Sequence, residues 1–403
     1  MPATCRTVAT HTADHLPVKR LRVGILYGGR SGEHEVSLAS AAAIFANIDL
    51  ARYEPIAIRI EKDGRWVLAD RPPSAASAAD VIDQVKSETA RLRGGREVFL
   101  PPRPGDATLV LVDRHSTRPD DAEAAASLTG LGLDVIFPVL HGPYGEDGTI
   151  QGLLELANVA YVGCGVLASA VGMDKAVMKV LFAARGLRVS RWKTVWRREW
   201  QRDRAGVAAA VEGALAYPLF VKPANLGSSL GISKARNAAE LGPAIDLAAE
   251  FDRKLVIEEA VKEAREIECA VLGNQDIEAS IPGEVVPARD FYDYEAKYID
   301  SGSRIEIPAK LTDRQAEDVR RQAVAAFQAI DGAGFARVDF LMTRSAGRLF
   351  VNEINTIPGF TTISMFAKLW AASGVEYPVV VDRLIALALE RHSQKQELKT
   401  SAF

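Results

Sequence analysis

The chain alternates short apolar runs with longer, Ala-rich amphipathic stretches along most of its length. Early in this pattern, residues 21–29 (LRVGILYGG) and 54–60 (EPIAIRI) are apolar enough to be buried strands, and residues 37–48 between them have the composition of a helix. A third strand at residues 134–140 is followed by a loop and by a helix at residues 150–158. Strands that alternate with helices are typical of a parallel α/β sheet, which is the fold class that we predict for this part of the chain.

Two regions do not follow this alternation. Residues 1–20 have no periodic apolar pattern and are expected to form a loose N-terminal extension. Residues 71–127 are rich in Pro, Ala, Gly and charged residues, which predicts an insertion with mobile loops. We therefore place the first domain at residues 21–163, with its boundary near Gly163.

After this boundary the pattern predicts two smaller α+β units. Residues 164–262 hold three short strands around a helix at residues 237–251. Residues 263–403 hold a long irregular loop, 286–304, of the kind that often acts as an active-site lid. The regular elements expected in this last unit are a helix and two paired core strands, at residues 312–331, 334–342 and 347–355.

The segment 173–186 has apolar residues at helical spacing and ends at Gly186, which can stop a helix. The spacing predicts an amphipathic helix at the start of the second unit. The residues that form its predicted apolar face are Met173, Val177, Val180, Leu181 and Ala184.

Composition and charge narrow the class of protein. The chain has 403 residues, 48% of them hydrophobic and 25% charged, which fits a soluble globular protein of two or three domains. The formal net charge of -3 gives no reason to expect a nucleic-acid or membrane partner. No apolar run approaches the roughly 20 residues that span a bilayer, and the N-terminal residues lack the apolar core of a signal peptide. Three scattered cysteines fit a reducing compartment, so the cytoplasm is the expected location.

Two apolar strands near the C-terminus carry polar residues in pairs. Arg337 and Asp339 share one face of the first strand, and Glu353 and Asn355 share one face of the second, because side chains alternate along a strand. If the strands are neighbours, Asp339, Glu353 and Asn355 converge as oxygen ligands of the kind that Mg²⁺ prefers. The alternative is structural, with Asp339 in a salt bridge to Arg337 and Glu353 at an exposed strand end. Two such pairs on successive strands favour the metal site.

A Gly/Ser loop after another strand predicts a phosphate site. In LFVKPANLGSSLGIS, Lys222 lies at the strand end, and Ser228 and Ser229 lie in a loop whose backbone N–H groups are accessible. Lys222 would neutralise phosphate charge, and Lys175, near the start of its helix, is a second candidate cation. The spacing is not that of a Walker A loop. An ordinary flexible hairpin and a solvated helix lysine are the alternatives.

Three carboxylates flank a turn between two strands, at Glu258, Glu259 and Glu266. They are placed to accept hydrogen bonds from a purine amino group and from ribose hydroxyls. A solvated acidic edge has the same spacing, and on spacing alone the two interpretations have equal weight.

The first strand ends in LYGGRSGEHEVS, whose glycines lack the G-x-G-x-x-G spacing of a dinucleotide site. This loop places Glu33 at the strand-to-helix turn, where a carboxylate suits an ammonium group better than a pyrophosphate. Alternatively, Glu33 or Glu35 only stabilises the helix N-terminus. His141, in the loop HGPYGEDG, could contact a ligand, and Lys297 and Tyr298 lie in the long loop that is expected to be a lid.

Together these segments resemble the D-alanine–D-alanine ligases of the ATP-grasp superfamily. The matching pieces are GGRSGEHEVS, HGPYGEDGTIQG, MDKAVMK, VKPANLGSSLGIS, REIECAVLGN, FYDYEAKYID, ARVDF and NEINTIPGFTTISM. They occur in the family's order over roughly residues 21–390, and such an ordered set is far more specific than any one loop. The resemblance implies a three-domain ATP-grasp architecture, in which an N-terminal Rossmann-like domain precedes a central subdomain at 164–262 and a C-terminal subdomain at 263–403.

The resemblance also implies a role for each matching residue. The ATP-binding residues would be Lys175, Lys222, Ser229, Glu266, Lys297 and, on the adenine side, Glu259, with Glu258 as the alternative. The Mg²⁺ ligands would be Asp339, Glu353 and Asn355. The group that links the first substrate's site to the lid would be Glu33, Ser228 and Tyr298, and the oxyanion would be stabilised by Arg337 and the backbone of Gly359. Further residues around the substrates would be His141, Ser364 and Met365.

The implied activity is ATP-dependent joining of two D-alanine molecules through a D-alanyl phosphate, for peptidoglycan precursor synthesis. It implies Mg²⁺ as cofactor, as two ions or with Mn²⁺ in their place, and a homodimer as the assembly. A D-alanine–D-lactate ligase is the closest rival, and Tyr298 within EAKY favours the dipeptide product. A nucleotide-dependent oxidoreductase, with Glu61 serving a ribose, is disfavoured by the glycine spacing and by Glu33. A non-catalytic ATP-binding protein is disfavoured because every matched catalytic position is intact.

Overall fold

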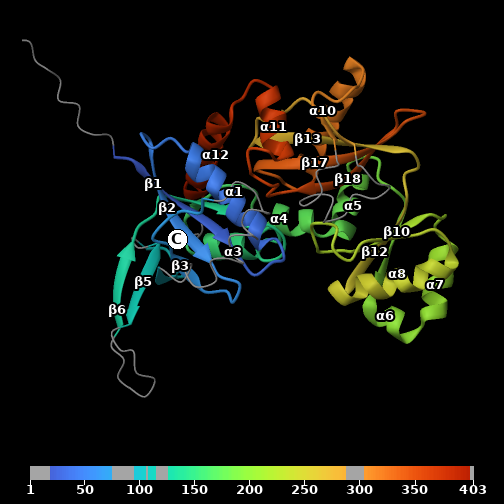
Figure 1. Cartoon of the computed structure of the whole chain (residues 1–403), viewed down its shortest axis with the longest axis horizontal. Coiled ribbons are helices and arrows are strands. Elements are labelled where there is room, and N and C mark those ends of the chain that lie inside the picture. Colours follow the sequence, from blue (N-terminus) through green and yellow to red (C-terminus); the bar gives the residue numbers. More distant parts are fainter. Residues whose placement is uncertain (1–18, 75–94, 106–107, 115–125, 287–303, 400–403) are drawn as a thin grey trace, which may run out of the picture.

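The computed structural model describes residues 19–74, 95–105, 108–114, 126–286 and 304–399. Within these residues the chain forms three β-sheets. Figure 1 shows the first sheet at the left, the second at the lower right and the third above them. Among the helices of these residues, none combines the length and the apolar character that a bilayer crossing needs.

The first sheet has a parallel core. Its central strand, β1 (Leu21–Gly28), pairs in parallel with β2 (Tyr53–Ile60) on one side and with β7 (Val135–Val139) on the other. β8 (Ala160–Tyr161) pairs in parallel with β7. The parallel α/β sheet expected from the sequence is therefore confirmed for these four strands.

Beyond β2 the sheet continues with antiparallel strands in the order β3, β4, β5 and β6. Their bounds are Trp66–Leu68, Arg96–Phe99, Leu109–Arg114 and Ala126–Leu131. The sequence pattern predicted only an insertion with mobile loops over residues 71–127 and missed β4 and β5. Both strands are short and lie among Pro- and Gly-rich turns, which hides their alternation. Val98 and Leu111 are nevertheless buried beneath the sheet, so the described parts of this segment extend the first sheet.

Helices cover both faces of the first sheet. α1 (His34–Asn47) packs over the apolar cluster that holds Ile25, and α3 (Thr149–Leu156) packs over the cluster that holds Leu26. Because adjacent residues of a strand point to opposite faces, α1 and α3 cover opposite faces of the sheet. The chain therefore leaves β1 and β7 in opposite directions.

The second sheet has the order β11-β10-β12-β9, and all its neighbours are antiparallel. The strand bounds, from β9 to β12, are Trp192–Trp196, Leu219–Pro223, Ser233–Ala235 and Lys254–Glu259. The helices that cover one face, from α6 to α8, are Arg197–Arg202, Arg204–Glu212 and Ala238–Phe251. The sequence predicted the helix and three of these strands but not β9.

The third sheet has the order β16-β15-β13-β17-β18, with β14 paired to β13. The strand bounds, from β13 to β18, are Ala264–Gly273, Glu278–Ala279, Gly283–Val286, Arg304–Glu306, Gly334–Thr343 and Leu349–Asn355. α10 (Asp313–Ala329) packs on one face. α11 (Met365–Ala372) and α12 (Tyr377–Gln396) pack on the other. These elements match the predicted helix and strand pair.

The start of α10 has a local cause. The hydroxyl of Thr312 accepts a hydrogen bond from the backbone N–H of Gln315, and the side chain of Gln315 accepts one from the backbone N–H of Thr312. This capping box satisfies two N–H groups that the helix itself leaves unpaired and stabilises the helix by about 1 kcal/mol.

Between the sheets lie α4 (Val166–Met173) and α5 (Lys175–Ala184). α5 confirms the predicted helix, but its buried face is not the predicted one. Val180 is 55% exposed, whereas Lys175 and Lys179 are buried. Carboxylates of the two neighbouring sheets pair with these lysines. Met178 and Phe182 of the same helix are fully buried in an apolar cluster. Apolar packing and charge pairing therefore both favour this rotation.

Candidate active site

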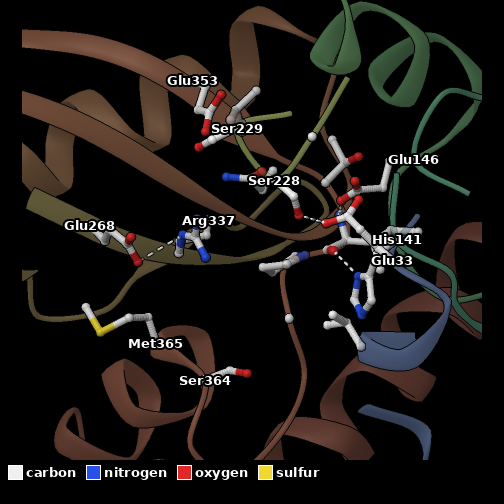
Figure 2. A pocket seen from close by; sticks show the side chains of 18 of the residues that line it. Glu33, His141, Glu146, Ser228, Ser229, Glu268, Arg337, Glu353, Ser364 and Met365 are labelled. Carbon is white, nitrogen blue, oxygen red and sulfur yellow. Dashed lines mark hydrogen bonds and ion pairs between the residues drawn. The ribbon is translucent and has the colours of Figure 1, made fainter. Parts of the chain in front are cut away.

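A cavity of about 260 Å³ lies where the three sheets meet. Loops of all three sheets contribute to its walls, as Figure 2 shows. The predicted site residues that line it are Glu33, His141, Lys175, Ser228, Ser229, Arg337, Glu353, Asn355, Gly359, Ser364 and Met365. Lys297 and Tyr298 lie outside the described residues.

The two polar pairs of the third sheet lie side by side. β17 and β18 are antiparallel neighbours, with Asp339 directly opposite Glu353 and Arg337 directly opposite Asn355. Val338, between the paired positions, points the other way into the core. A bulge follows Asp339 and shifts the register only beyond both pairs. The expectation that these strands are neighbours is confirmed.

Arg337 is held by two carboxylates. Its Nε and Nη2 atoms each donate to an Asp339 oxygen at 2.7 Å, and Nε lies 3.0 Å from Oε2 of Glu268. Burial alone would lower the pKa of Arg337, but the two carboxylates outweigh it and raise the pKa well above its usual value. The side-chain amide of Asn355 also donates to Asp339, at 3.0 Å. The salt bridge that was the structural alternative thus exists within the predicted ligand group.

Asp339, Glu353 and Asn355 fit Mg²⁺ as a partial set of ligands that a nucleotide and water would complete. Mg²⁺ usually binds one or two carboxylates, keeps several water ligands and binds substrate phosphates. Within the part of the chain that the structure describes, no three His, Cys, Asp or Glu side chains are grouped to hold a metal ion. Two carboxylates and an amide therefore suit an ion that arrives with a nucleotide, not a dedicated protein site.

Lys175 connects the Gly/Ser loop to this donor set. Its Nζ donates to the backbone oxygen of Leu226 at 2.8 Å and lies 3.5 Å from Oε2 of Glu353. In the same loop, Ser228 and Ser229 have φ angles of 50° and 58°. This left-handed backbone is uncommon for residues other than glycine and is concentrated at functional sites. The loop therefore has a specific shape beside a buried cation.

Lys222 and Glu258 form a buried ion pair on the second sheet, with Nζ and Oε1 2.5 Å apart. Nζ of Lys179 lies 2.6 Å from Oε2 of the same carboxylate, and the hydroxyl of Ser190 donates to it at 2.8 Å. Burial alone would raise the pKa of Glu258, but the two lysines outweigh it and lower the pKa. Burial would likewise lower the pKa of Lys222, but the carboxylates of Glu258 and Glu353 raise it. Glu258 and Lys222 therefore favour their charged forms, whereas burial lowers the pKa of Lys179.

Glu259 points away from this cluster, because side chains alternate along β12. It accepts hydrogen bonds from Nη1 of Arg191 at 3.1 Å and from the backbone N–H of Ala216 at 2.9 Å. Glu259 therefore lies on the face of β12 away from the buried lysines, and its assignment as the adenine-side carboxylate stays a prediction. Between Glu259 and Glu266 the chain makes a turn in which Glu263 has a φ of 49°. Glu258, the alternative, lies beside the lysines.

Glu266 lies on β13, opposite Leu341, and its carboxylate contributes to the raised pKa of Lys222. It shares its strand face with Glu268, two residues later, so the row of charged side chains continues from Lys222 towards Arg337. Glu266 therefore lies near Lys222, on the strand face of β13 that also carries Glu268.

Glu33 is buried just before α1 and its side chain does not cap that helix. The hydroxyl of Ser228 donates a hydrogen bond to its Oε1 atom instead. Two glycines leave room for the carboxylate: a Cβ at Gly142 would lie 2.5 Å from Oε2, and one at Gly227 would lie 3.1 Å from it. Glu35 forms a separate ion pair with a lysine. The interpretation of Glu33 as only a helix cap is therefore wrong.

His141 lines the cavity but uses both ring nitrogens within the protein. Its Nδ1 donates to the backbone oxygen of Ile357 at 2.9 Å, and its Nε2 lies 3.0 Å from the hydroxyl of Ser40. Burial lowers the pKa of His141. The neutral ring therefore ties the first sheet to the loop after β18, and the described contacts make it a positioning residue.

Glu146 was missed by the sequence analysis. Its two carboxyl oxygens accept hydrogen bonds from the backbone N–H groups of Gly142, at 2.9 Å, and of Ile357, at 3.3 Å. Burial, reinforced by the nearby charge of Glu33, raises the pKa of Glu146 to about 8. Glu146 thus holds the loop that surrounds Glu33 against the loop that carries Gly359.

Gly359, Ser364 and Met365 lie on the side of the cavity away from Glu353, as Figure 2 shows for the last two. Ser364 belongs to a tight turn, because its hydroxyl lies 2.7 Å from that of Thr361 and accepts from the backbone N–H of Thr361. Phe360, the residue before Thr361, is also held, because the hydroxyl of Tyr377 donates to its backbone oxygen at 2.5 Å.

Sequence signals existed for two other missed residues, Lys179 and Glu268. Lys179 lies one helical turn after Lys175, so both share a helix face. Glu268 lies two residues after Glu266 and so shares its strand face. Glu146 had no comparable signal, because its partners are backbone groups of two distant loops.

The second and third sheets, with their helices, enclose buried lysines and a set of oxygen donors beside a parallel α/β domain. This combination defines the ATP-grasp class of ATP-dependent ligases. Two family models match the chain: "D-ala D-ala ligase N-terminus" over residues 22–164 and "D-ala D-ala ligase C-terminus" over residues 181–386. The chain belongs to the D-alanine–D-alanine ligase family and is a ligase. The resemblance noted in the sequence and the ATP-grasp fold are thereby confirmed.

Individual relatives agree with this placement. A D-alanine–D-alanine ligase of Heliobacterium modesticaldum is 47% identical over 94% of this chain and 97% of its own length. One from Bacillus licheniformis is 46% identical over 94% and 99%. Among solved structures, the D-alanine–D-alanine ligase of Coxiella burnetii has a TM-score of 0.72 at 34% identity, over 94% of this chain and 97% of its own. The VanG D-Ala:D-Ser ligase of Enterococcus faecalis has a TM-score of 0.74 at 32% identity, over 92% and 100%.

Proposed function

We propose that the chain joins two D-alanine molecules, at the expense of ATP, to make a peptidoglycan precursor. The observation that carries this proposal is the charge arrangement of the cavity. A fixed carboxylate, Glu33, and a fixed guanidinium, Arg337, lie on opposite sides of it (Figure 2). Such a pair suits an amino acid, whose ammonium group seeks a carboxylate and whose carboxyl oxygens seek a cation.

In the first step, Glu33 binds the ammonium group of one D-alanine. A carboxylate oxygen of that D-alanine attacks the γ-phosphorus of ATP, the bond to the ADP oxygen breaks, and D-alanyl phosphate and ADP form. Lys175 and Lys222 offset the negative charge of the phosphates. Glu258 and Glu266 hold the adenine and ribose side of the nucleotide, and Ser229 contacts a phosphate.

Asp339, Glu353 and Asn355 would hold Mg²⁺, as two ions or with Mn²⁺ in their place. When bound, Mg²⁺ supplies positive charge that offsets the charge of the phosphate oxygens. Arg337 donates to both oxygens of Asp339. If Asp339 binds the ion, Arg337 has to share these oxygens with it, so we place Arg337 between the ion and the substrate.

In the second step, the amine of the other D-alanine attacks the carbonyl carbon of D-alanyl phosphate. Arg337 and the backbone N–H of Gly359 stabilise the oxyanion of the tetrahedral intermediate. The bond to the phosphate oxygen then breaks, and phosphate leaves with the oxygen that came from the first carboxylate. The attacking nitrogen loses its proton to solvent, and the dipeptide forms. By the family resemblance, Lys297 would contact a phosphate, and Tyr298 would act with Glu33 and Ser228.

One similar solved structure is named a D-Ala:D-Ser ligase, so the test compares second substrates. We assign the choice to the wall that holds Ser364 and Met365. The test is ADP release with Mg²⁺-ATP and D-alanine alone, then with D-serine or D-lactate added, and product mass for each. Turnover with D-alanine alone that gives the dipeptide supports the proposal. Turnover only with D-lactate or D-serine would contradict it.

Three further properties belong to this proposal. We infer a homodimer, a cytoplasmic location and a division into domains near residues 163 and 262, all from the family. Sedimentation equilibrium of the full chain tests the dimer, and a monomer at micromolar concentration would contradict it.

A further inference from the structure

A second cavity, of about 340 Å³, lies in the first domain, at the carboxyl ends of β1, β2 and β7. Its walls are the loop between β1 and α1, the turn between β2 and β3, and the loop between β7 and α3, together with the first turns of α3. Figure 1 labels β1, β2, β3, α1 and α3 near one another in the left half of the view. The cavity shares only one lining residue, His141, with the candidate active site.

The topology of the sheet favours ligand binding at this place. α1 and α3 cover opposite faces, so the chain leaves the neighbouring strands β1 and β7 in opposite directions. In open α/β sheets a crevice opens outside the carboxyl ends of the strands at such a switch point, and ligands bind there. The volume is also within the range of pockets that hold small molecules.

The inner walls of the cavity are apolar. They are formed by Ile60, Trp66, Leu140, Ile150 and Leu153. Leu140 is 3% exposed and Ile150 is 5% exposed, so these walls belong to the core of the first domain. Such walls favour an aromatic or branched apolar group.

The mouth of the cavity carries a cation. The guanidinium of Arg30 lies over the ring of Tyr144, 4.9 Å from its centre. Within the described residues Arg30 has no carboxylate partner, because Asp63, the acidic residue of the lining, binds Arg65 at 2.7 Å. Arg30 is therefore placed to bind an anion that enters with an apolar group, and its planar fork matches a carboxylate.

We propose that this cavity is a second ligand site, for a small monocarboxylate that carries an aromatic or branched apolar group. We further infer that its occupant changes the binding of the first substrate at Glu33, a coupling that rests on the proposed function.

One hydroxyl connects the two sites. The side chain of Ser31, which lines the second cavity, donates to the backbone oxygen of His141 at 2.7 Å and accepts from the backbone N–H of Glu33 at 3.2 Å. A ligand that moves Ser31 therefore moves the backbone on which Glu33 is mounted. Coupling through two such hydrogen bonds is expected to be modest.

The binding test uses 1-naphthylacetate and its neutral analogue 1-naphthylacetamide, titrated by calorimetry into the full chain. We expect the carboxylate to bind at least tenfold more tightly than the amide. Arg30→Gln should remove this preference, and Leu153→Trp, which fills the cavity, should abolish binding. Leu156→Trp is the matched control, because Leu156 is 62% exposed on the same helix and lies outside the cavity. Equal affinity for acid and amide, or binding that survives Leu153→Trp, would overturn the site.

The coupling test measures ADP release with and without saturating 1-naphthylacetate. The KM for D-alanine should change at least threefold in the wild type and in Leu156→Trp, but not in Leu153→Trp, and the KM for ATP should stay within twofold. Intact binding with an unchanged KM for D-alanine would overturn the coupling. Absence of any turnover with D-alanine would overturn the proposed function and with it the coupling, whereas the titration still decides the site.

Discussion

The hydroxyl of Ser228 donates a hydrogen bond to the carboxylate of Glu33, so the loop after β10 meets the start of α1 although 195 residues separate them in the chain. This contact closes one side of the cavity and orients a wall carboxylate that has no ion pair among the described residues. Of the other wall carboxylates, Glu353 is near Lys175, Glu268 is near Arg337, and Glu146 binds backbone N–H groups and has a raised pKa. The hydrogen bond from Ser228 to Glu33 therefore predicts that the ammonium group of the first D-alanine binds at Glu33.

Glu33→Gln keeps the size of the side chain and removes its charge. Because the substrate's ammonium group loses its ion-pair partner, kcat/KM for D-alanine should fall about 100-fold, while the KM for ATP changes little. Steady-state ADP release measures both. Glu35→Gln is the matched control, since Glu35 pairs with Lys62 outside the cavity and should keep near-normal kinetics. Equal losses in the two variants would contradict the assignment.

Glu353→Gln tests the metal site on β18. The amide cannot offset the charge of Mg²⁺, so turnover at saturating ATP should fall about 1000-fold, and excess Mg²⁺ or Mn²⁺ should restore it only in part. The thermal midpoint should stay within a few degrees of the wild type. Glu278→Gln, in an exposed ion pair with Arg383, is the control for loss of a carboxylate elsewhere in this sheet. Near-normal activity of Glu353→Gln would refute the ligand set.

Glu258→Gln and Glu259→Gln are adjacent and chemically identical changes that separate the two candidates for the adenine-side carboxylate. Glu258 lies beside Lys179 and Lys222, whereas Glu259 binds Arg191. Glu258→Gln should raise the KM for ATP at least tenfold. It should also lower stability by about 3 kcal/mol, because two buried lysines lose their counter-charge. Glu259→Gln should change the KM for ATP less than twofold. If Glu259→Gln instead raised the KM for ATP more than Glu258→Gln, the adenine-side carboxylate would be Glu259.

The raised pKa of Glu146, about 8, predicts a pH dependence of stability. In the unfolded chain this carboxyl has its usual pKa near 4.5, so the folded state binds the proton more tightly. Its contribution to stability is therefore complete below about pH 4.5 and is lost as the pH rises through about 8. Denaturant unfolding of the wild type should show a fall of a few kcal/mol between pH 6 and pH 9.

Glu146→Gln cannot titrate, so the same pH range should leave its free energy of unfolding nearly constant, whatever its starting stability. The comparison uses the slope with pH and not the absolute stability. Parallel slopes in the two proteins would show that the carboxyl of Glu146 is already ionised at pH 6.

The sequence could predict the features that depend on local periodicity. Side chains on a strand alternate with a period of two, so the pairs Arg337/Asp339 and Glu353/Asn355 each had to share a face, and the register of β17 and β18 confirms that they meet. The same reasoning predicted the parallel strands of the first domain and the helix that became α10.

The features that the sequence could not predict depend on neighbours far along the chain. Lys175 and Lys179 of α5 face inward towards carboxylates on β12 and β18, which no local pattern specifies. That Glu258 and not Glu259 lies beside Lys222 depends on which face of β12 meets that lysine. Glu146 binds backbone groups of two loops, one of them 211 residues away. Local patterns determine which side chains share a face, but only tertiary packing determines what that face meets.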